Sequence, residues 1–151
     1  MDQSKRQLKS VEVLKKYKRG SVWWVELPLN LFTHIQGGTR PCVIVSNPLE
    51  RSGVVTVCPL STKIDDFKTH PKIKLKKEGQ ILVEQITTVD ISSIKDNLGQ
   101  LSNTEIKVLN KVMKAYLLSD DYKQDTPNED DEPEPDSNIT INININMENK
   151  K

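Results

Sequence analysis

The sequence predicts a mainly β domain, a small barrel or sandwich, followed by one helix and an acidic tail. Three observations predict this: five or six short β-type segments separated by turn residues, a single well-capped helical segment, and a change of composition after Ser119. The chain has 151 residues, of which 35% are hydrophobic, so one domain with extensions is favoured over two domains. We expect an N-terminal extension over residues 1–17, the domain over 18–119 and the tail over 120–151.

The N-terminal extension combines lysines with a helical spacing of apolar residues. Within residues 4–18, four apolar residues lie three apart: Leu8, Val11, Leu14 and Tyr17. Their spacing of three indicates a short amphipathic helix or a basic arm. A turn at Arg19-Gly20 then leads into residues 22–27, a run of β-forming residues that predicts the first strand.

Further β-type runs follow at short intervals. Residues 42–46 and 54–58 are continuous apolar runs joined by turn residues, which is typical of buried neighbouring strands. Residues 72–76 alternate lysine with apolar side chains, which predicts a half-exposed strand with a basic outer face. The remaining strands are expected at residues 81–83 and 87–89.

One helix is predicted with a defined start. Ser102 and Glu105 form a capping box, in which the serine oxygen accepts from an unpaired backbone N–H and the glutamate reaches back. An apolar stripe follows and ends near Ser119. The stripe consists of Ile106, Leu109, Val112, Met113, Tyr116 and Leu117. Such a stripe indicates packing and implies no chemistry.

Charge divides the chain into two parts. Residues 1–119 contain 19 Lys and Arg against 11 Asp and Glu, a net charge of +8, whereas residues 120–151 contain 3 against 10, a net charge of −7. A basic body is typical of proteins that bind phosphates, although ordinary solvated lysines explain it equally well. The acidic, proline-punctuated stretch 120–136 predicts disorder. Residues 139–146 alternate isoleucine with polar residues; a sheet-edge or self-associating strand is the alternative to disorder.

Several features bear on location and cofactors. No signal peptide or run of about 20 apolar residues is visible, so we expect a soluble, cytoplasmic protein outside the membrane. Cys42 and Cys58 each lie in an apolar run and are expected to be buried thiols rather than a disulfide. Together with His34 and His70, they offer no metal-ligand spacing, so no metal or other cofactor is expected. His70 precedes a proline and is interpreted as structural.

The most informative segment is Gln36–Pro41, which closes a long loop over residues 28–41. Gly37 and Gly38 permit an unusual backbone path and close ligand approach, and the proline fixes the exit into the next strand. Arg40 is therefore expected at the mouth of a strand, where a guanidinium can bind a phosphate with two hydrogen bonds. An ordinary turn with a surface arginine explains the segment equally well.

Two further features contain side chains that could take part in binding or catalysis. Ser61, Thr62 and Lys63 end the second buried strand and place two hydroxyls and a cation together, which is the kind of cluster that binds an oxyanion. A plain turn at the end of a strand explains them nearly as well. His34 lies in the long loop, and imidazole side chains can act as acid or base near neutral pH. A loop histidine that is merely solvated is the alternative.

In their order and spacing, these segments resemble the MazF/PemK family of toxins over about residues 17–118. The matching segments are Lys18-Arg19-Gly20, Trp23–Leu27, Gln36–Pro41, Val43–Asn47, Pro59–Lys63, Glu84-Gln85, Thr88–Asp90 and Leu98–Ser102. No single segment is decisive, and their shared order carries the resemblance.

The resemblance implies an SH3-like β-barrel, usually a homodimer, of the kind shared with the gyrase poison CcdB. It implies the toxin of a type II toxin-antitoxin system, which cleaves single-stranded RNA at selected sequences without a metal. It also implies an antitoxin whose acidic, flexible C-terminal segment covers the active groove. In such cleavage the neighbouring 2′-OH attacks phosphorus, a base removes its proton, and an acid protonates the departing 5′ oxygen.

The resemblance also assigns roles to individual residues. Arg40 matches the family's catalytic arginine, and Ser61 stands where the second catalytic residue is usually threonine. His34 matches the histidine of the plasmid-borne Kid branch, and Glu84 aligns with that branch's catalytic aspartate. Arg40 suits stabilisation of the phosphoryl oxygens, while His34 and Glu84 are alternative bases. Substrate contacts are expected from Gln36, Gly37, Gly38, Thr39, Thr62 and Lys63.

Two positions depart from the family pattern, and two other interpretations stay open. Ile35 replaces a usual glutamate and Thr87 a common arginine, which leaves the general base and the RNA sequence preference open. The alternatives are a barrel that poisons a protein target or binds nucleic acid without cutting it, and a homologue that keeps only the fold. Arg40 and Ser61 favour the nuclease, because a protein-binding barrel needs neither.

Overall fold

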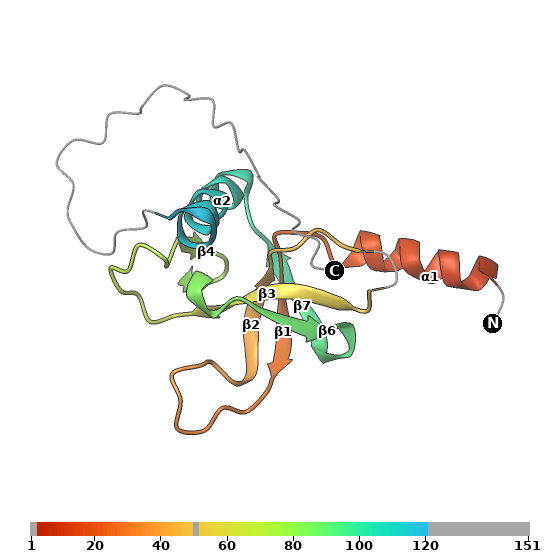
Figure 1. The fold of residues 1–151 in the computed structure, drawn as a ribbon, viewed down its shortest axis with the longest axis horizontal. Helices are drawn as coiled ribbons and strands as arrows, with labels where there is room; N and C mark the ends of the chain where they lie inside the picture. Colours follow the sequence, from red (N-terminus) through yellow and green to blue (C-terminus); the bar gives the residue numbers. More distant parts are fainter. Residues whose placement is uncertain (1–2, 50–51, 121–151) are drawn as a thin grey trace, which may run out of the picture.

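The computed structural model describes residues 3–49 and 52–120, and shows a curled sheet with one helix beside it and another extending away (Figure 1). In chain order the elements are α1 (Gln3–Lys16), β1 (Ser21–Leu27), β2 (Gly38–Ile44), β3 (Val54–Ser61), β4 (Lys72–Lys74), β5 (Glu78–Ile81), η1 (Val83–Gln85), β6 (Thr87–Asp90), η2 (Ile91–Ser93), β7 (Ile94–Gln100) and α2 (Asn103–Leu118). The expected mainly β domain with a C-terminal helix is confirmed. The predictions for residues 121–151 lie outside the described residues.

The sheet is antiparallel and turns around β3. Its strands run in the order β4-β5-β3-β2-β1-β7, and β6 pairs with β3 outside this path. The first part of β3 pairs with β6 over Val54–Val57, whereas Leu60 and Ser61 pair with β5. One long strand therefore belongs to two sheet segments, and its last residue, Ser61, lies in the segment that pairs with β5.

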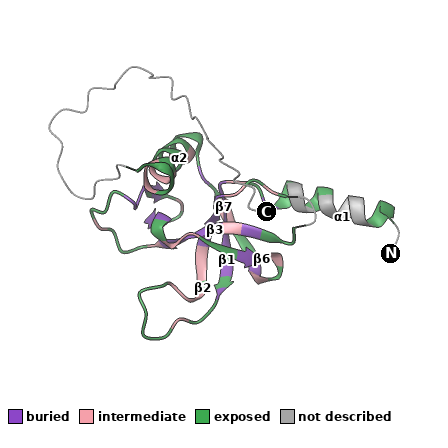
Figure 2. Ribbon diagram, viewed as in Figure 1, coloured by how far each residue is buried: buried purple, intermediate pink, exposed green. Residues whose placement is uncertain are grey.

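Both faces of the central strands are buried, which explains their continuous apolar sequence. Along β2, Cys42 and Ile44 belong to one hydrophobic cluster, while Val43 and the following Val45 belong to a second. Leu109 of α2 is completely buried in that second cluster. Figure 2 shows the buried residues gathered where the central strands cross. The core thus fixes the positions of β2 and β3, the strands that carry Arg40 and Ser61.

The predicted helices are both present. α1 spans Gln3–Lys16, and the next residue, Tyr17, is buried with its ring 5.2 Å from that of Trp23. α2 begins after Ser102, whose side chain accepts from the Glu105 backbone N–H while the glutamate accepts from the Ser102 N–H. The capping box is confirmed. Among the described residues, no helix is both long and apolar enough to cross a membrane.

The extent of the long loop was predicted incorrectly. The strand expected to begin at Cys42 begins at Gly38, so Arg40 and Pro41 lie within β2 and the loop covers only residues 28–37. β1 provides the partners for these four residues, and β2 pairs with β3 only from Cys42 onward. A proline, which has no backbone N–H to donate, is tolerated at position 41 because β2 is not yet paired with β3 there.

Three strand predictions also need correction. The strand expected over 72–76 ends at Lys74, because the chain turns with a hydrogen bond from Leu75 N to Lys77 O. Of the strand expected over 81–83, only Ile81 is in β5, and Val83 opens the 3-10 helix η1. The strand β7 was not predicted, because its Lys-Asp-Asn-Leu-Gly sequence lacks β-forming residues and depends on pairing with β1.

The two cysteines are buried and free, as expected. Burial raises the pKa of Cys42 and of Cys58 to about 12, and in the case of Cys42 the neighbouring Arg40 opposes this only in part. Because a thiol reacts as the thiolate, neither residue is an available nucleophile. The candidate chemistry therefore has to come from other side chains.

Candidate active site

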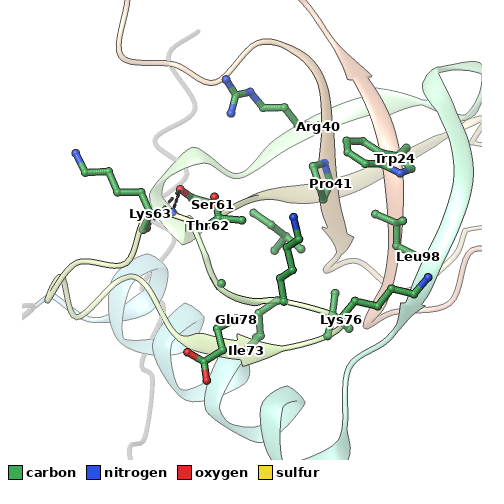
Figure 3. Close-up of a pocket in the computed structure, with 14 residues that line it drawn as sticks. Trp24, Arg40, Pro41, Ser61, Thr62, Lys63, Ile73, Lys76, Glu78 and Leu98 are labelled. Atoms are coloured by element: carbon green, nitrogen blue, oxygen red, sulfur yellow. Dashed lines mark hydrogen bonds between the residues drawn. The ribbon is translucent and has the colours of Figure 1, made fainter.

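A groove of about 480 Å³ lies beside β2 and the end of β3. Figure 3 shows Trp24, Pro41 and Leu98 along one side of it, with Ser61, Thr62 and Lys63 at the other end. Trp24 is partly exposed, with 37% of its surface accessible. The groove therefore offers an aromatic face beside hydroxyls and cations.

Arg40 is positioned by both strand pairing and its own side chain. It lies opposite Val25 of β1 in the register of the sheet, and its Nε donates to the carbonyl oxygen of Gly37 at 2.8 Å. This bond uses only Nε and orients the guanidinium plane. The two terminal amino groups can then meet two oxygens of one phosphate.

Ser61 is the last residue of β3 and is half-buried in the groove wall. Its Oγ accepts from the backbone N–H of Lys63 at 3.1 Å and donates to the Lys63 carbonyl at 3.4 Å. These bonds shape the turn that presents Thr62 and Lys63, which are both exposed. The structure therefore brings Arg40, Ser61, Thr62 and Lys63 to one groove although 20 residues of sequence separate Arg40 from the rest.

The groove has a mostly basic rim. Lys63, Lys76 and Lys77 line it together with a single carboxylate, that of Glu78, and all four are exposed. Three cations against one anion attract phosphates. The sequence predicted a basic strand face here but no site role for Lys76, Lys77 or Trp24. The lysine alternation was the available signal for the first of these.

His34 lies beside the groove rather than in it. A second hollow of about 420 Å³ is lined by residues 29–31 and 33–37 of the loop and by Arg40, so Arg40 borders both. His34 and Gln36 belong to this second hollow. His34 is exposed, and its backbone is tied down, because its carbonyl oxygen accepts from Gln85 Nε2 at 3.2 Å.

Gly37 at the end of the loop and Gly38 at the start of β2 are glycines for different structural reasons. At Gly37 a Cβ would lie 2.5 Å from the Pro28 carbonyl oxygen and 2.9 Å from the Asn30 nitrogen, so the loop closes on itself there. Gly38 has a φ of +74°, which glycine adopts readily. Neither Gly38 nor Thr39 lines the groove or the second hollow, and Thr39 pairs with Glu26 of β1.

Exposed apolar residues gather on the same loop. They are Leu29, Leu31, Phe32 and Ile35. Phe32 is fully exposed and has a φ of +63°, a conformation that is rare outside glycine. Nothing in its local sequence indicates this conformation, and the loop therefore combines backbone strain with exposed apolar surface.

Glu84 lies apart from the groove and makes a different set of contacts. Its Oε1 is 2.7 Å from Nε2 of His70, and Nδ1 of the same ring is 2.6 Å from Asp65 Oδ1. Burial disfavours the charge on His70, but the hydrogen bonds to Glu84 and Asp65 outweigh it and raise the pKa of His70. Burial likewise opposes ionisation of Asp65, and the hydrogen bonds from His70 and Gln80 lower its pKa. Sequence reasoning assigned no role to Asp65 or Gln80.

Gln85 was named in the sequence analysis only as part of a matching segment, yet it connects two parts of the molecule. Its Oε1 accepts from the backbone N–H of Gln36 at 2.7 Å, and its Nε2 donates to the His34 carbonyl. It therefore fastens the loop to η1. In the described part of the chain, no group of three or more His, Cys, Asp or Glu side chains could hold a metal ion.

Comparisons with known proteins agree with this arrangement. Residues 18–117 match the family model of PemK-like, MazF-like toxins of type II toxin-antitoxin systems. The endoribonuclease MazF of Staphylococcus saprophyticus is 37% identical over 91 residues, which cover 54% of this chain and 76% of that protein.

Solved structures share the fold. MazF from Deinococcus radiodurans superposes with a TM-score of 0.58 at 17% identity, covering 65% of this chain and 93% of its own. A mycobacterial endoribonuclease in complex with its cognate antitoxin superposes with a TM-score of 0.54 at 20% identity, covering 65% and 91%. The expected barrel fold is confirmed by these superpositions.

Proposed function

The chain belongs to the PemK-like, MazF-like toxins of type II toxin-antitoxin systems, and we propose that it acts as an endoribonuclease that cleaves single-stranded RNA without a metal ion. Residues 18–119 form the proposed catalytic domain. The observation that carries the proposal is the convergence of Arg40 with Ser61, Thr62 and Lys63 in one basic groove. A relative of 37% identity is itself an endoribonuclease.

Substrate binding follows from the shape and charge of the groove. The lysines of the rim attract the RNA backbone, and the exposed face of Trp24 suits stacking of an unpaired base. Stacking needs a base that is free of its partner strand, so single-stranded RNA fits better than a duplex. Of the other expected contacts, Gln36 and Gly37 line the second hollow, whereas Gly38 and Thr39 line neither hollow and stay predictions.

Arg40 is the proposed stabiliser of the transition state. As the 2′ oxygen attacks phosphorus, negative charge grows on the two non-bridging oxygens. The terminal amino groups of Arg40 can donate to both, and the Ser61 hydroxyl can add a further bond once it turns from the Lys63 carbonyl. The bond from Arg40 Nε to the Gly37 carbonyl holds the guanidinium before the reaction, so Arg40 needs little reorganisation.

His34 is the proposed general base. It borders the hollow that Arg40 shares with the groove, whereas the alternative, Glu84, already accepts a hydrogen bond from His70. His34 removes the 2′ proton, and the departing 5′ oxygen takes a proton from Arg40 or from water. The products are a 2′,3′-cyclic phosphate and a 5′-hydroxyl.

The partners follow from charge and family. An antitoxin with an acidic, flexible segment fits the same basic groove and would exclude RNA from it. The mycobacterial relative is solved in complex with its cognate antitoxin. We also propose a homodimer, which sedimentation at micromolar concentration tests, and a cytoplasmic location, where messenger RNA is available.

The test is to incubate the purified protein with mixed-sequence single-stranded RNA in EDTA and to map the ends. We expect 2′,3′-cyclic phosphate and 5′-hydroxyl ends. Replacing Arg40→Ala should lower the cleavage rate by about 10²–10³-fold, because one oxyanion donor contributes about 2.7–4 kcal/mol. The control is Lys111→Ala on the exposed surface of α2. Undiminished cleavage by R40A, or loss of cleavage in EDTA, would refute the mechanism.

A further inference from the structure

We propose that a cluster of two buried residues, His70 and Gln80, and two partly exposed carboxylates, Asp65 and Glu84, here called the His70 clamp, positions the catalytic loop from outside the groove. The clamp holds η1 in place, and η1 carries Gln85, which fastens the loop. This inference rests on the proposed function, because the loop carries His34 and anchors Arg40. Glu84 is then a positioning residue rather than the base.

The clamp is built around a doubly bonded imidazole. His70 is 9% exposed, and its two ring nitrogens lie 2.6 Å from Asp65 Oδ1 and 2.7 Å from Glu84 Oε1. A neutral imidazole has one N–H, whereas the protonated ring donates from both nitrogens. Carboxylates on either side therefore favour the charged ring, and hydrogen bonds between charged groups are the shorter and stronger kind.

Gln80 completes the clamp and connects strand β5 to it. It is 1% exposed, its Nε2 donates to Asp65 Oδ2 at 3.0 Å, and its Oε1 accepts from the Asp65 backbone N–H at 3.1 Å. The clamp therefore joins the segment between β3 and β4, strand β5 and η1. Such a network is rigid because each of its members restricts the others.

A short path of hydrogen bonds leads from the clamp to the catalytic groups. Glu84 is followed by Gln85, whose side chain holds the Gln36 N–H at 2.7 Å and the His34 carbonyl at 3.2 Å. The next residue of the loop, Gly37, accepts from Arg40 Nε at 2.8 Å. A shift of η1 would therefore reach both His34 and Arg40.

The position of Glu84 supports positioning over direct catalysis. It lines neither the groove nor the second hollow, and one oxygen of its carboxylate, Oε1, is hydrogen-bonded to the His70 ring. A base must reach the proton that it removes. Glu84 instead stands one residue from the fastening side chain, where holding η1 is the function that its contacts allow.

The discriminating experiment compares Glu84→Gln with Glu84→Ala. The amide of E84Q still accepts from His70 Nε2, so we expect it to keep most of the cleavage rate. E84A removes the acceptor, and we expect kcat to fall by about 10-fold or more with KM changed by less than about twofold, because misplaced groups lower the rate. If E84Q loses as much rate as E84A, Glu84 is the base and the proposal is overturned.

A double-mutant cycle tests the path itself. His70→Gln and Gln85→Ala break it at different points, so the H70Q/Q85A double variant should lose no more rate than the more severe single variant. If the rate losses of H70Q and Q85A multiply in the double variant, the two residues act independently and the proposed path is overturned. Ser102→Ala is the matched control, because it weakens an unrelated cap and should leave kcat unchanged.

Hydrogen exchange separates this inference from the proposed function. The Gln36 amide, which Gln85 protects, should exchange faster in E84A and H70Q than in the wild type, and at the wild-type rate in S102A. Unchanged exchange in E84A and H70Q would overturn the positioning role. This measurement needs no RNA, so a wild-type protein that does not cut RNA would refute the proposed function alone.

Discussion

The loop over residues 28–37 and the helix α2 are held by opposite means. α2 is fixed locally by the capping box of Ser102 and Glu105, and it buries Leu109 completely in the core. The loop exposes most of its side chains and depends on hydrogen bonds to Gln85, which is 49 and 51 residues away in sequence. In Figure 1 the two lie at opposite ends of the sheet.

This difference separates stability from the proposed chemistry. Burial of apolar surface in α2 contributes directly to the free energy of folding. The loop buries little apolar surface. It positions His34 and the Gly37 carbonyl that holds Arg40, so its conformation matters mainly to catalysis. Changes in α2 should therefore alter unfolding but not cleavage, and changes in the loop should do the reverse.

The largest effect is expected on the helix side. Leu109→Ala removes a completely buried side chain and leaves a cavity, so the free energy of unfolding should fall by about 2–5 kcal/mol. Urea unfolding measures this. Cleavage of RNA well below the unfolding midpoint should stay at the wild-type rate, and a large loss of rate in folded L109A would contradict the separation.

On the loop side, Gly37→Ala tests how closely the loop must keep its shape. The new Cβ would lie 2.5 Å from the Pro28 carbonyl oxygen, so the backbone has to move. A displacement of about 1 Å can lower an enzymatic rate by about 10²-fold, and we expect a loss of that order in kcat. The control is Gly53→Ala, where φ is +69° but no atom lies within 4 Å of the added Cβ. G53A should lose stability and keep its rate.

A smaller effect is expected at the start of α2. Ser102→Ala removes the side-chain acceptor of the Glu105 N–H, which should lower the free energy of unfolding by about 1 kcal/mol. Thermal unfolding of S102A beside the wild type measures it. The cleavage rate should not change, and an equal stability of the two proteins would show that the cap is redundant.

The smallest effect is a pH dependence of the His70 clamp. The hydrogen bonds from His70 to Glu84 and Asp65 raise its pKa above the unfolded value of about 6.5. This stabilisation is fully present below that value and is lost as pH rises through the folded pKa. The stability difference between wild type and H70Q should therefore narrow from pH 6 to pH 9. Asp65 stays ionised throughout, because its pKa is lowered. A difference that widens with pH would contradict the charged clamp.

Features that depend on neighbours along the chain could be predicted from the amino-acid sequence alone. The capping box predicted where α2 begins, and the apolar runs predicted the buried parts of β2 and β3. The order of motifs led to the family, which the match over residues 18–117 confirms. Arg40 and Ser61 were singled out in the same way, and their catalytic roles remain a proposal. Local rules suffice for such features because a cap or a buried strand is encoded within a few residues.

Features that depend on partners far away in sequence became visible only in the folded chain. β7 contains only one β-branched residue, Ile94, and depends on pairing with β1, and the same partner extends β2 back to Gly38. The His70 clamp and the fastening of the loop by Gln85 join residues up to 51 positions apart. Such contacts leave no periodic pattern in a single sequence. The ring of His70 and its two carboxylate partners are brought together by folding, and the local sequence around each residue does not indicate these contacts.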